Sequence, residues 1–161
     1  MSLVAKLLPP ANVVLDLSVS SKKRLFEQIG LLFENNHGIA RTLVFDSLFT
    51  RERLGSTALG QGVAIPHGRI KGLKDALGAF LRLGQPVAFD APDGKPVSLL
   101  FVLLVPEQAT EKHLQILSEL AQMFSDRNLR ESMAGAPDAG ALHQLIAAWQ
   151  PDVSGQRRAA A

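Results

Sequence analysis

The stretch "VSLLFVLLV", residues 97–105, decides the fold class, because it is an almost uninterrupted apolar run of nine residues. A helix needs about 20 apolar residues to cross the hydrocarbon layer of a membrane, so this run is too short to span one. Runs of this length are typical of a strand that is buried inside a sheet. We therefore expect a central strand here, with helices covering the sheet.

Two segments that precede this strand have the apolar spacing of amphipathic helices. "SSKKRLFEQIGLLFE", residues 20–34, offers a serine as N-cap, and "NNHG" at 35–38 ends the helix. "TLVFDSLFTRERLG", residues 42–55, predicts a second helix with Arg51 in its last turn and Gly55 at its end.

Two more helices are predicted after the central strand. "ATEKHLQILSELAQMF", residues 109–124, has strong helical periodicity, and Thr110 as N-cap makes His113 the third helical residue. "APDAGALHQLIAAWQ", residues 136–150, predicts the last helix. The tail "PDVSGQRRAAA", residues 151–161, is small and polar and is predicted to be disordered.

Further strands are predicted between the helical segments. "GVAIP", residues 62–66, predicts a short strand that leaves His67 exposed at its end. "ALGAFLRL", residues 76–83, predicts another, and a turn at 89–97 leads into the central strand. Because helices and strands alternate, the prediction is one α/β domain over residues 1–150, with a central mixed β-sheet flanked by helices.

Composition narrows the classes of function. The 161 residues are 47 % hydrophobic and 20 % charged, as in folded globular proteins. The absence of cysteine excludes thiolate chemistry, and a net charge of +2 without a dense basic block argues against nucleic-acid binding. The apolar N-terminus is interrupted by Lys6 and two prolines and lacks a cleavage pattern. We therefore expect no signal peptide, no membrane span and a cytoplasmic location.

The four histidines differ in what their positions predict. His37 lies at a helix end and His143 lies between leucines of the last helix, so structural roles are expected for both. His67 follows a predicted strand and a loop rich in glycine and hydroxyl groups. His113 lies in the first turn of a helix, where the positive end of the dipole keeps an imidazole neutral and attracts anions.

Phosphoryl transfer is the chemistry that two neutral imidazoles and an arginine could perform together. A neutral imidazole can attack phosphorus when its second nitrogen is held by a fixed acceptor. The phosphoryl oxygens then need cationic and N–H donors, which Arg51 and His113 could supply. Two alternatives stay open at this point: a zinc hydrolase that uses both histidines and Glu111, and a binding module that never carries phosphate.

The motifs "RERLGSTALGQGVAIPHGR", residues 51–69, and "EKHLQILSELA", residues 111–121, resemble a known family. It is the fructose–mannitol type of enzyme IIA from the bacterial phosphoenolpyruvate-dependent phosphotransferase system (PTS), specifically its nitrogen-regulatory branch. The resemblance covers residues 5–150. It implies the IIA fold, the PTS EIIA type-2 domain, and neither metal nor other cofactor.

The resemblance also implies roles for residues of this chain. His67 would accept a phosphoryl group, through Nε2, from a phosphohistidine of the carrier protein HPr or its nitrogen-pathway paralogue NPr. His113 and Arg51 would stabilise that group, and the loop of Gly55, Ser56 and Thr57 would position it.

Two functions remain within this family. The regulatory branch implies signalling by phosphorylation state in nitrogen and potassium regulation, with a potassium transporter or a sensor kinase as possible targets. A sugar-specific IIA, which passes its phosphate to a separate IIB protein, is the alternative.

Overall fold

The strand predicted over residues 97–105 is the centre of the sheet as β6 (Val97–Pro106). The computed structural model describes residues 2–108 and 111–151. Its sheet has the order β1-β5-β6-β3-β2, with β4 also paired to β6, so β6 has neighbours on both sides. It runs antiparallel to β5 and parallel to β3 and β4. The sheet is therefore mixed, as predicted.

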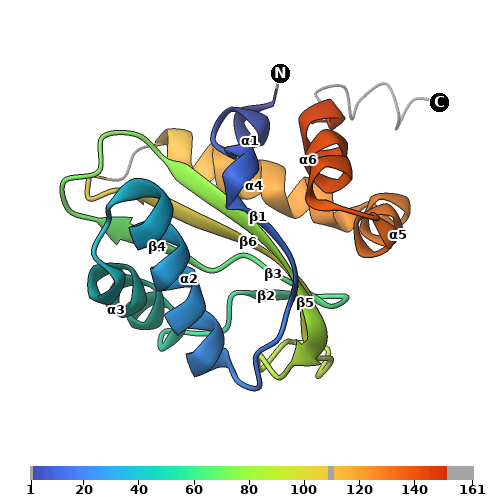
Figure 1. The fold of residues 1–161 in the computed structure, drawn as a ribbon, viewed down its shortest axis with the longest axis horizontal. Helices are drawn as coiled ribbons and strands as arrows, with labels where there is room; N and C mark the ends of the chain where they lie inside the picture. Colours follow the sequence, from blue (N-terminus) through green and yellow to red (C-terminus); the bar gives the residue numbers. More distant parts are fainter. Residues whose placement is uncertain (1, 109–110, 152–161) are drawn as a thin grey trace.

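The elements follow one another along the chain as a helical turn, an early strand, two helices, a set of strands and three final helices (Figure 1). Besides β6 they are α1 (Leu3–Lys6), η1 (Pro10–Asn12), β1 (Val13–Leu17), α2 (Lys22–His37), α3 (Arg41–Glu52), β2 (Ala58–Gly60), β3 (Val63–Ala64), β4 (His67–Ile70), β5 (Leu77–Val87), α4 (Glu111–Ser125), α5 (Arg127–Gly135) and α6 (Ala139–Ala148).

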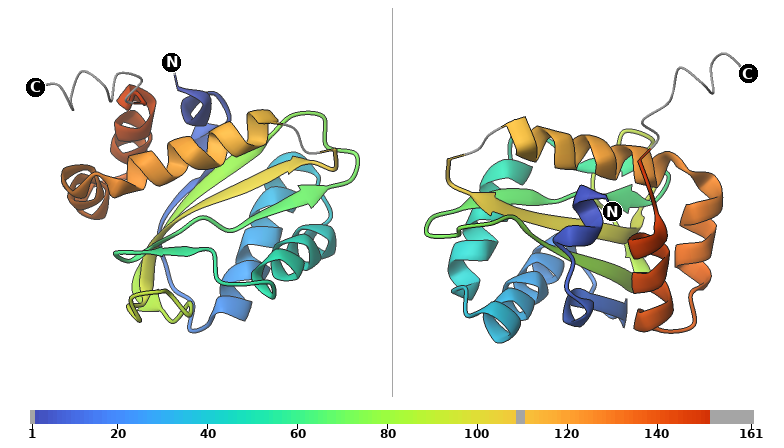
Figure 2. Two further views of the ribbon diagram at one scale, coloured as in Figure 1. Left: turned by 180° about the vertical axis from the view of Figure 1, so that it is seen from behind. Right: turned by 90° about the horizontal axis from the view of Figure 1, so that it is seen from above.

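The apolar sequence of β6 serves two cores, because successive side chains of a strand point to opposite faces. Leu99, Phe101 and Leu103 pack into a core with residues of α1, α4, α5 and α6. Leu100 and Leu104 pack into a second core with residues of α2 and α3. Helices therefore cover both faces of the sheet, as Figure 2 shows from behind and from above.

Local signals set the helix ends close to their predicted positions. The Ser21 side chain accepts a hydrogen bond from the Arg24 amide at the start of α2, and Gly38 ends that helix in the left-handed conformation. Arg51 lies in the last turn of α3, which ends at Glu52 and thus before Gly55. Asp138 caps α6. His113 is the third residue of α4, whereas the predicted cap Thr110 and the tail from residue 152 lie outside the described residues.

The strand prediction around His67 was wrong in one respect. His67 is the first residue of β4, and its ring is half-buried, whereas we expected an exposed ring beyond the end of a strand. Pro66 separates β3 from β4 because it has no N–H to donate to a neighbouring strand. Its carbonyl still accepts a hydrogen bond from the Leu103 amide of β6 at 2.9 Å, so the chain continues along the same edge of β6.

Six elements were not predicted from the sequence: α1, η1, β1, β2, β4 and α5. Five of them have at most five residues, too few to show a periodicity. The sixth, α5, is polar and buries only Met133 in the core. Its capping residue, Asp126, accepts a hydrogen bond from the Leu129 amide and was the available signal.

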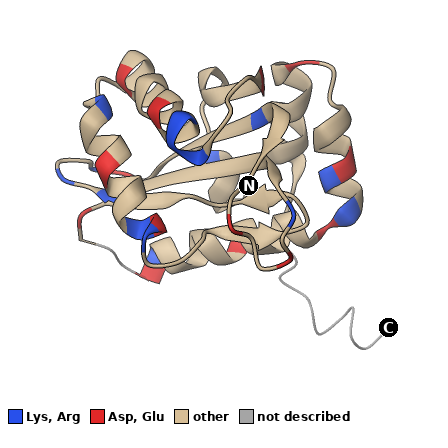
Figure 3. Ribbon diagram, turned by 90° about the horizontal axis from the view of Figure 1, so that it is seen from below, with Lys and Arg blue, Asp and Glu red and all other residues tan. Residues whose placement is uncertain are grey.

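Charged residues of both signs occur in many elements of the described chain. Figure 3 shows lysine, arginine, aspartate and glutamate residues spread over the helices and loops of the face seen from below. Within the described residues, no helix combines the length and hydrophobicity that a membrane crossing requires.

Candidate functional site

His67 is held by a hydrogen bond from its own chain. Its Nδ1 lies 2.8 Å from the carbonyl oxygen of Ile65. A carbonyl oxygen only accepts, so Nδ1 carries the proton and donates it. In the neutral ring the lone pair then resides on Nε2, which makes Nε2 the nucleophilic nitrogen.

Arg51, His67 and His113 line one pocket of about 670 Å³. They come from three elements that are distant in the sequence: the last turn of α3, the start of β4 and the first turn of α4. Arg69, which lies two residues after His67 in β4, also lines the pocket. Two guanidinium groups therefore border the cavity that contains both imidazoles, an arrangement suited to an anion.

The surroundings of both imidazoles favour the neutral form. Burial is the main cause that lowers the pKa of His67, and the positive charges of Arg51 and His113 act in the same direction. The hydrogen bond to Ile65 and the carboxylate of Glu52 oppose this shift but do not cancel it. Burial, and then the charge of Arg69, lowers the pKa of His113.

The loop predicted to position a phosphoryl group does not line this pocket. The Gly55 carbonyl accepts a hydrogen bond from Nη1 of Arg51 at 2.8 Å, which fixes the guanidinium relative to the loop. The Ser56 hydroxyl donates to the Phe89 carbonyl at 2.5 Å. The Thr57 side chain is buried against Glu52. These contacts make the loop a scaffold for Arg51 and for the strand that carries His67.

A buried carboxylate organises that scaffold. Glu52 has a side chain only 3 % exposed and pairs with Nζ of Lys22 at 3.0 Å. It also accepts hydrogen bonds from the Thr57 amide at 3.0 Å and from the Thr57 hydroxyl at 2.7 Å. Lys22 in turn lies 4.4 Å from the centre of the Phe89 ring.

The scaffold continues to the imidazole ring of His67. The Thr57 carbonyl accepts a hydrogen bond from the Ile65 amide at 3.0 Å, and the Ile65 carbonyl accepts from Nδ1 of His67. A chain of hydrogen bonds therefore connects Lys22 and Glu52 with His67.

Sequence reasoning missed Arg69 and Glu52 as members of the site. Arg69 is the last residue of the quoted motif of residues 51–69. Residues two apart in a strand point to the same face, and this spacing from His67 was the available signal. For Glu52, only a charged residue next to Arg51 was visible, since burial cannot be inferred from a single position. The two other histidines lie outside the pocket: Nε2 of His37 contacts the Asn12 side chain, and Nε2 of His143 is 2.9 Å from the Leu8 carbonyl oxygen.

Three exposed leucines surround the pocket. Leu43, Leu54 and Leu114 belong to its lining, and 40 %, 82 % and 66 % of their respective surfaces are exposed. Exposed apolar groups gathered around one opening are typical of a protein-binding surface. We call these three residues the leucine rim.

Gly68 is required for the contact between β4 and α3. A Cβ atom at this position would overlap the Ser47 side chain and lie 3.1 Å from its backbone carbonyl carbon. We expect Gly68→Ala to lower the free energy of unfolding by about 1–3 kcal/mol, because α3 must move away from β4. Urea unfolding measures this. Gly135→Ala, where an added Cβ meets nothing within 4 Å, is the control, and equal losses in the two variants would contradict the expectation.

The zinc alternative requires a cluster of ligands. Within residues 2–108 and 111–151, no three or more histidine, cysteine, aspartate or glutamate side chains are grouped so that they could hold a metal ion.

A family model and a curated relative place this chain in the same protein family. Residues 6–149 match the family model "Phosphoenolpyruvate-dependent sugar phosphotransferase system, EIIA 2". The "Nitrogen regulatory protein" of Pseudomonas aeruginosa is 44 % identical over 148 residues, which cover 88 % of this chain and 92 % of that protein.

Solved structures agree with this assignment. The nitrogen regulatory protein IIA-Ntr from Neisseria meningitidis is 55 % identical with a TM-score of 0.85, over 90 % of this chain and 99 % of that one. Enzyme IIAMTL from Escherichia coli, solved in complex with phosphorylated enzyme IIBMTL, has a TM-score of 0.74 at 19 % identity, over 89 % of this chain and 100 % of that one. The second match shows the common fold alone. The chain thus belongs to the EIIA 2 family of the phosphoenolpyruvate-dependent phosphotransferase system.

Proposed function

We propose that this protein is a regulatory phosphocarrier that accepts a phosphoryl group on Nε2 of His67. The donor would be a phosphohistidine of HPr or NPr. A bond forms between Nε2 and phosphorus while the nitrogen–phosphorus bond of the donor breaks, so the group passes from one imidazole to the other. The observation that carries this proposal is the hydrogen bond from Nδ1 to the Ile65 carbonyl, which leaves the Nε2 lone pair for attack.

The other polar groups of the pocket would stabilise the charge of the transferred group. Arg51 is held by the Gly55 carbonyl at the edge of the cavity, and its guanidinium can donate to phosphoryl oxygens. His113 faces the same cavity from α4 and can donate a further hydrogen bond. Transfer of this kind depends mainly on positioning and on charge stabilisation, which these groups supply without a metal.

The experiment that tests this function is a measurement of intact mass. The purified protein is incubated with phosphoenolpyruvate, enzyme I and either HPr or NPr. We expect the mass of one phosphoryl group, lost again in acid as for a phosphohistidine. Failure of both carriers to phosphorylate the folded protein would favour the binding module over the phosphocarrier.

The lowered pKa of His67 predicts that the ring keeps its neutral, nucleophilic form at pH values where an ordinary histidine is partly protonated. An ordinary histidine, with a pKa of 6.5, is half protonated at pH 6.5 and has then lost half of its nucleophilic form. In the folded protein the His67 imidazole should stay mostly neutral at that pH, because burial disfavours its charged form.

We therefore expect the imidazole signals of His67 in NMR spectra to titrate below pH 6.5. A histidine-containing peptide serves as the reference. A midpoint at or above that of the peptide would contradict the expectation.

The leucine rim would receive the carrier protein. Apolar residues around a reactive centre allow a partner to dock and to exclude water during the transfer. We expect Leu54→Asp to raise the KM for the phosphorylated carrier about tenfold, since one well-buried apolar contact contributes on the order of 1–2 kcal/mol.

A phosphotransfer assay at varied carrier concentration measures this KM. Leu59→Asp is the control, because Leu59 is 40 % exposed but lies in β2, outside the pocket. If the KM rises equally in both variants, the leucine rim is not part of the docking surface.

Regulation is favoured over sugar transport by the relatives that have the higher identities. The nitrogen regulatory proteins from P. aeruginosa and N. meningitidis are 44 % and 55 % identical to this chain, whereas the fructose-specific EIIA component of Haloferax volcanii is 36 % identical over 107 residues. In this role the charge added at His67 would change the pocket and its rim, and a target would bind one form better than the other. A potassium transporter and a sensor kinase remain candidates for that target, and the cytoplasmic location stays a prediction.

A further inference from the structure

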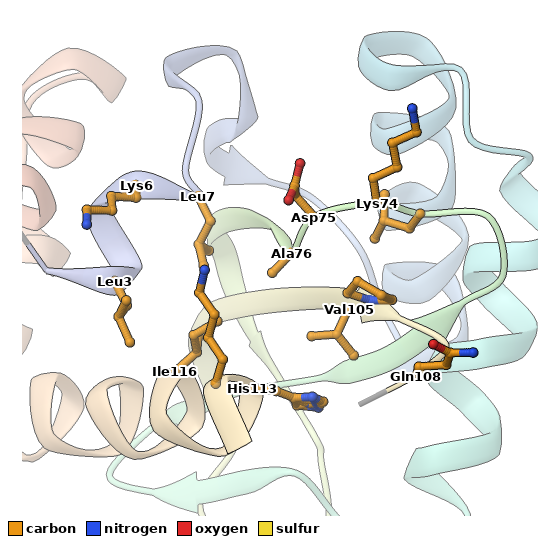
Figure 4. A pocket seen from close by; sticks show the side chains of 13 residues that line it. Leu3, Lys6, Leu7, Lys74, Asp75, Ala76, Val105, Gln108, His113 and Ile116 are labelled. Carbon is orange, nitrogen blue, oxygen red and sulfur yellow. The ribbon is translucent and has the colours of Figure 1, made fainter. Parts of the chain in front are cut away.

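A second pocket adjoins the phosphoryl site and shares His113 and Val105 with it. Its volume is about 550 Å³, within the range of small-molecule sites. It forms where α1, the loop of residues 73–76, the end of β6 and the first turns of α4 meet (Figure 4). The function proposed above gives this pocket no role.

The floor of the second pocket is apolar. Leu7, Val105 and Ile116 are buried core residues that contribute to its lining. Leu3, Leu73 and Ala76 also line the pocket and are partly exposed. An occupant therefore gains stability by covering their apolar surface.

The rim of the second pocket is positively charged. Its lining includes three lysines, Lys6, Lys74 and Lys112, and one acid, Asp75. Lys6 and Lys74 stand on opposite sides of the pocket in Figure 4. Within residues 2–108 and 111–151, none of these four residues takes part in an ion pair. The excess of positive charge would attract an anion.

We propose that the second pocket binds a small organic anion, with its apolar body on Leu3, Leu73 and Ala76 and its carboxylate or phosphate among the lysines. Inorganic phosphate alone would leave the apolar floor in contact with water, and a neutral apolar molecule would leave the ammonium groups without a counter-ion. The apolar floor and the charged rim together therefore select a molecule that has both an apolar body and an anionic group.

His113 connects this ligand with the phosphoryl site. The same imidazole faces both pockets, so an anion in the second pocket changes the charge around a group that borders His67. The ligand could then regulate phosphoryl acceptance, and this consequence, unlike the binding itself, rests on the proposed function. Binding is tested on the unphosphorylated protein, so its outcome is separate from that of the mass experiment.

The test is a titration of the isotope-labelled full chain, followed by the amide signals of residues 74–76 and 112–116 in NMR spectra. Hexanoate and hexyl phosphate are the probes, and they distinguish a carboxylate from a phosphate ligand. Hexanol lacks the charge, and acetate lacks most of the apolar body. We expect saturable shifts with one or both probes and an affinity at least fivefold above those of hexanol and acetate. No saturable shift with either probe, or equal affinity for hexanol or acetate, would overturn the proposal.

Variants locate the site. Lys74→Met and Lys112→Met keep the length of the side chain and remove its charge, and we expect each to weaken binding of the probe at least threefold. Lys23→Met, on the exposed surface of α2, is the control. Unchanged signals elsewhere in the spectrum show that each variant is folded. Equal affinity in all three variants and the original chain would overturn the assignment to this pocket.

Discussion

His67→Ala is expected to take up no phosphoryl group from either HPr or NPr, whereas the original chain takes up one. The alanine variant lacks the imidazole that lines the pocket and that the Ile65 carbonyl orients for attack through Nε2. Loss of a covalent nucleophile removes the reaction path, so no residual uptake through this pocket is expected. Intact mass after incubation with phosphoenolpyruvate, enzyme I and the carrier measures it.

Two further histidine variants make this result specific. His143→Ala removes an imidazole that contacts the Leu8 carbonyl outside the pocket, and it should be phosphorylated as the original chain is. His113→Ala keeps the nucleophile and should slow uptake without abolishing it; about 10²–10³-fold is the usual cost of removing one charge-stabilising donor. Phosphorylation of His67→Ala to the level of the original chain would assign the acceptor to another residue.

Glu52→Ala is expected to produce the largest loss of stability among single changes near the site. It leaves the Thr57 amide, the Thr57 hydroxyl and the Lys22 ammonium without the acceptor they share in a buried position. The two buried groups of Thr57 are then unpaired, whereas Lys22 keeps the Phe89 carbonyl and Asp90 as partners, and the combined loss is about 2–4 kcal/mol in the free energy of unfolding. Urea unfolding measures the loss. Glu131→Ala, which breaks an exposed pair with Arg127, should change stability by about 0.5 kcal/mol or less.

Glu52→Ala should also slow phosphoryl acceptance. Glu52 holds Thr57, the Thr57 carbonyl holds Ile65, and the Ile65 carbonyl orients His67. Removal of the carboxylate also removes a charge that raises the pKa of His67, so this pKa should fall further in Glu52→Gln. Thr57→Ser keeps the hydroxyl and should retain the original rate, whereas Thr57→Val should not. An unchanged His67 titration in Glu52→Gln, together with full activity of Thr57→Val, would limit Glu52 to a role in stability.

Much of the fold was predictable because its signals are local. The apolar run of residues 97–105 required cover on both faces, and the helices that supply it have clear periodicity and capping residues at Ser21 and Asp138. Short elements such as β1 and β2 were not predictable, since three to five residues carry no period and depend on neighbours that pair with them.

The candidate site divides in the same way. By itself, the sequence determined which residue types could carry phosphoryl chemistry and, through the quoted motifs, the family to which they belong. Only the tertiary structure decided that Arg51, His67, Arg69 and His113 line one pocket, because packing of α3 and α4 around β4 and β6 brings together residues that are distant in the chain.

The tertiary structure also decided the roles of the loop and of Glu52. A hydroxyl in a glycine-rich loop can face either a ligand or the protein, and here Ser56 and Thr57 are bonded to Phe89 and Glu52. Burial of a carboxylate depends on side chains from other elements, in this case Lys22 of α2, and no local pattern specifies it. The sequence therefore determined the chemistry available to this protein, and the packing of distant segments decided which groups face the ligand and which hold them in place.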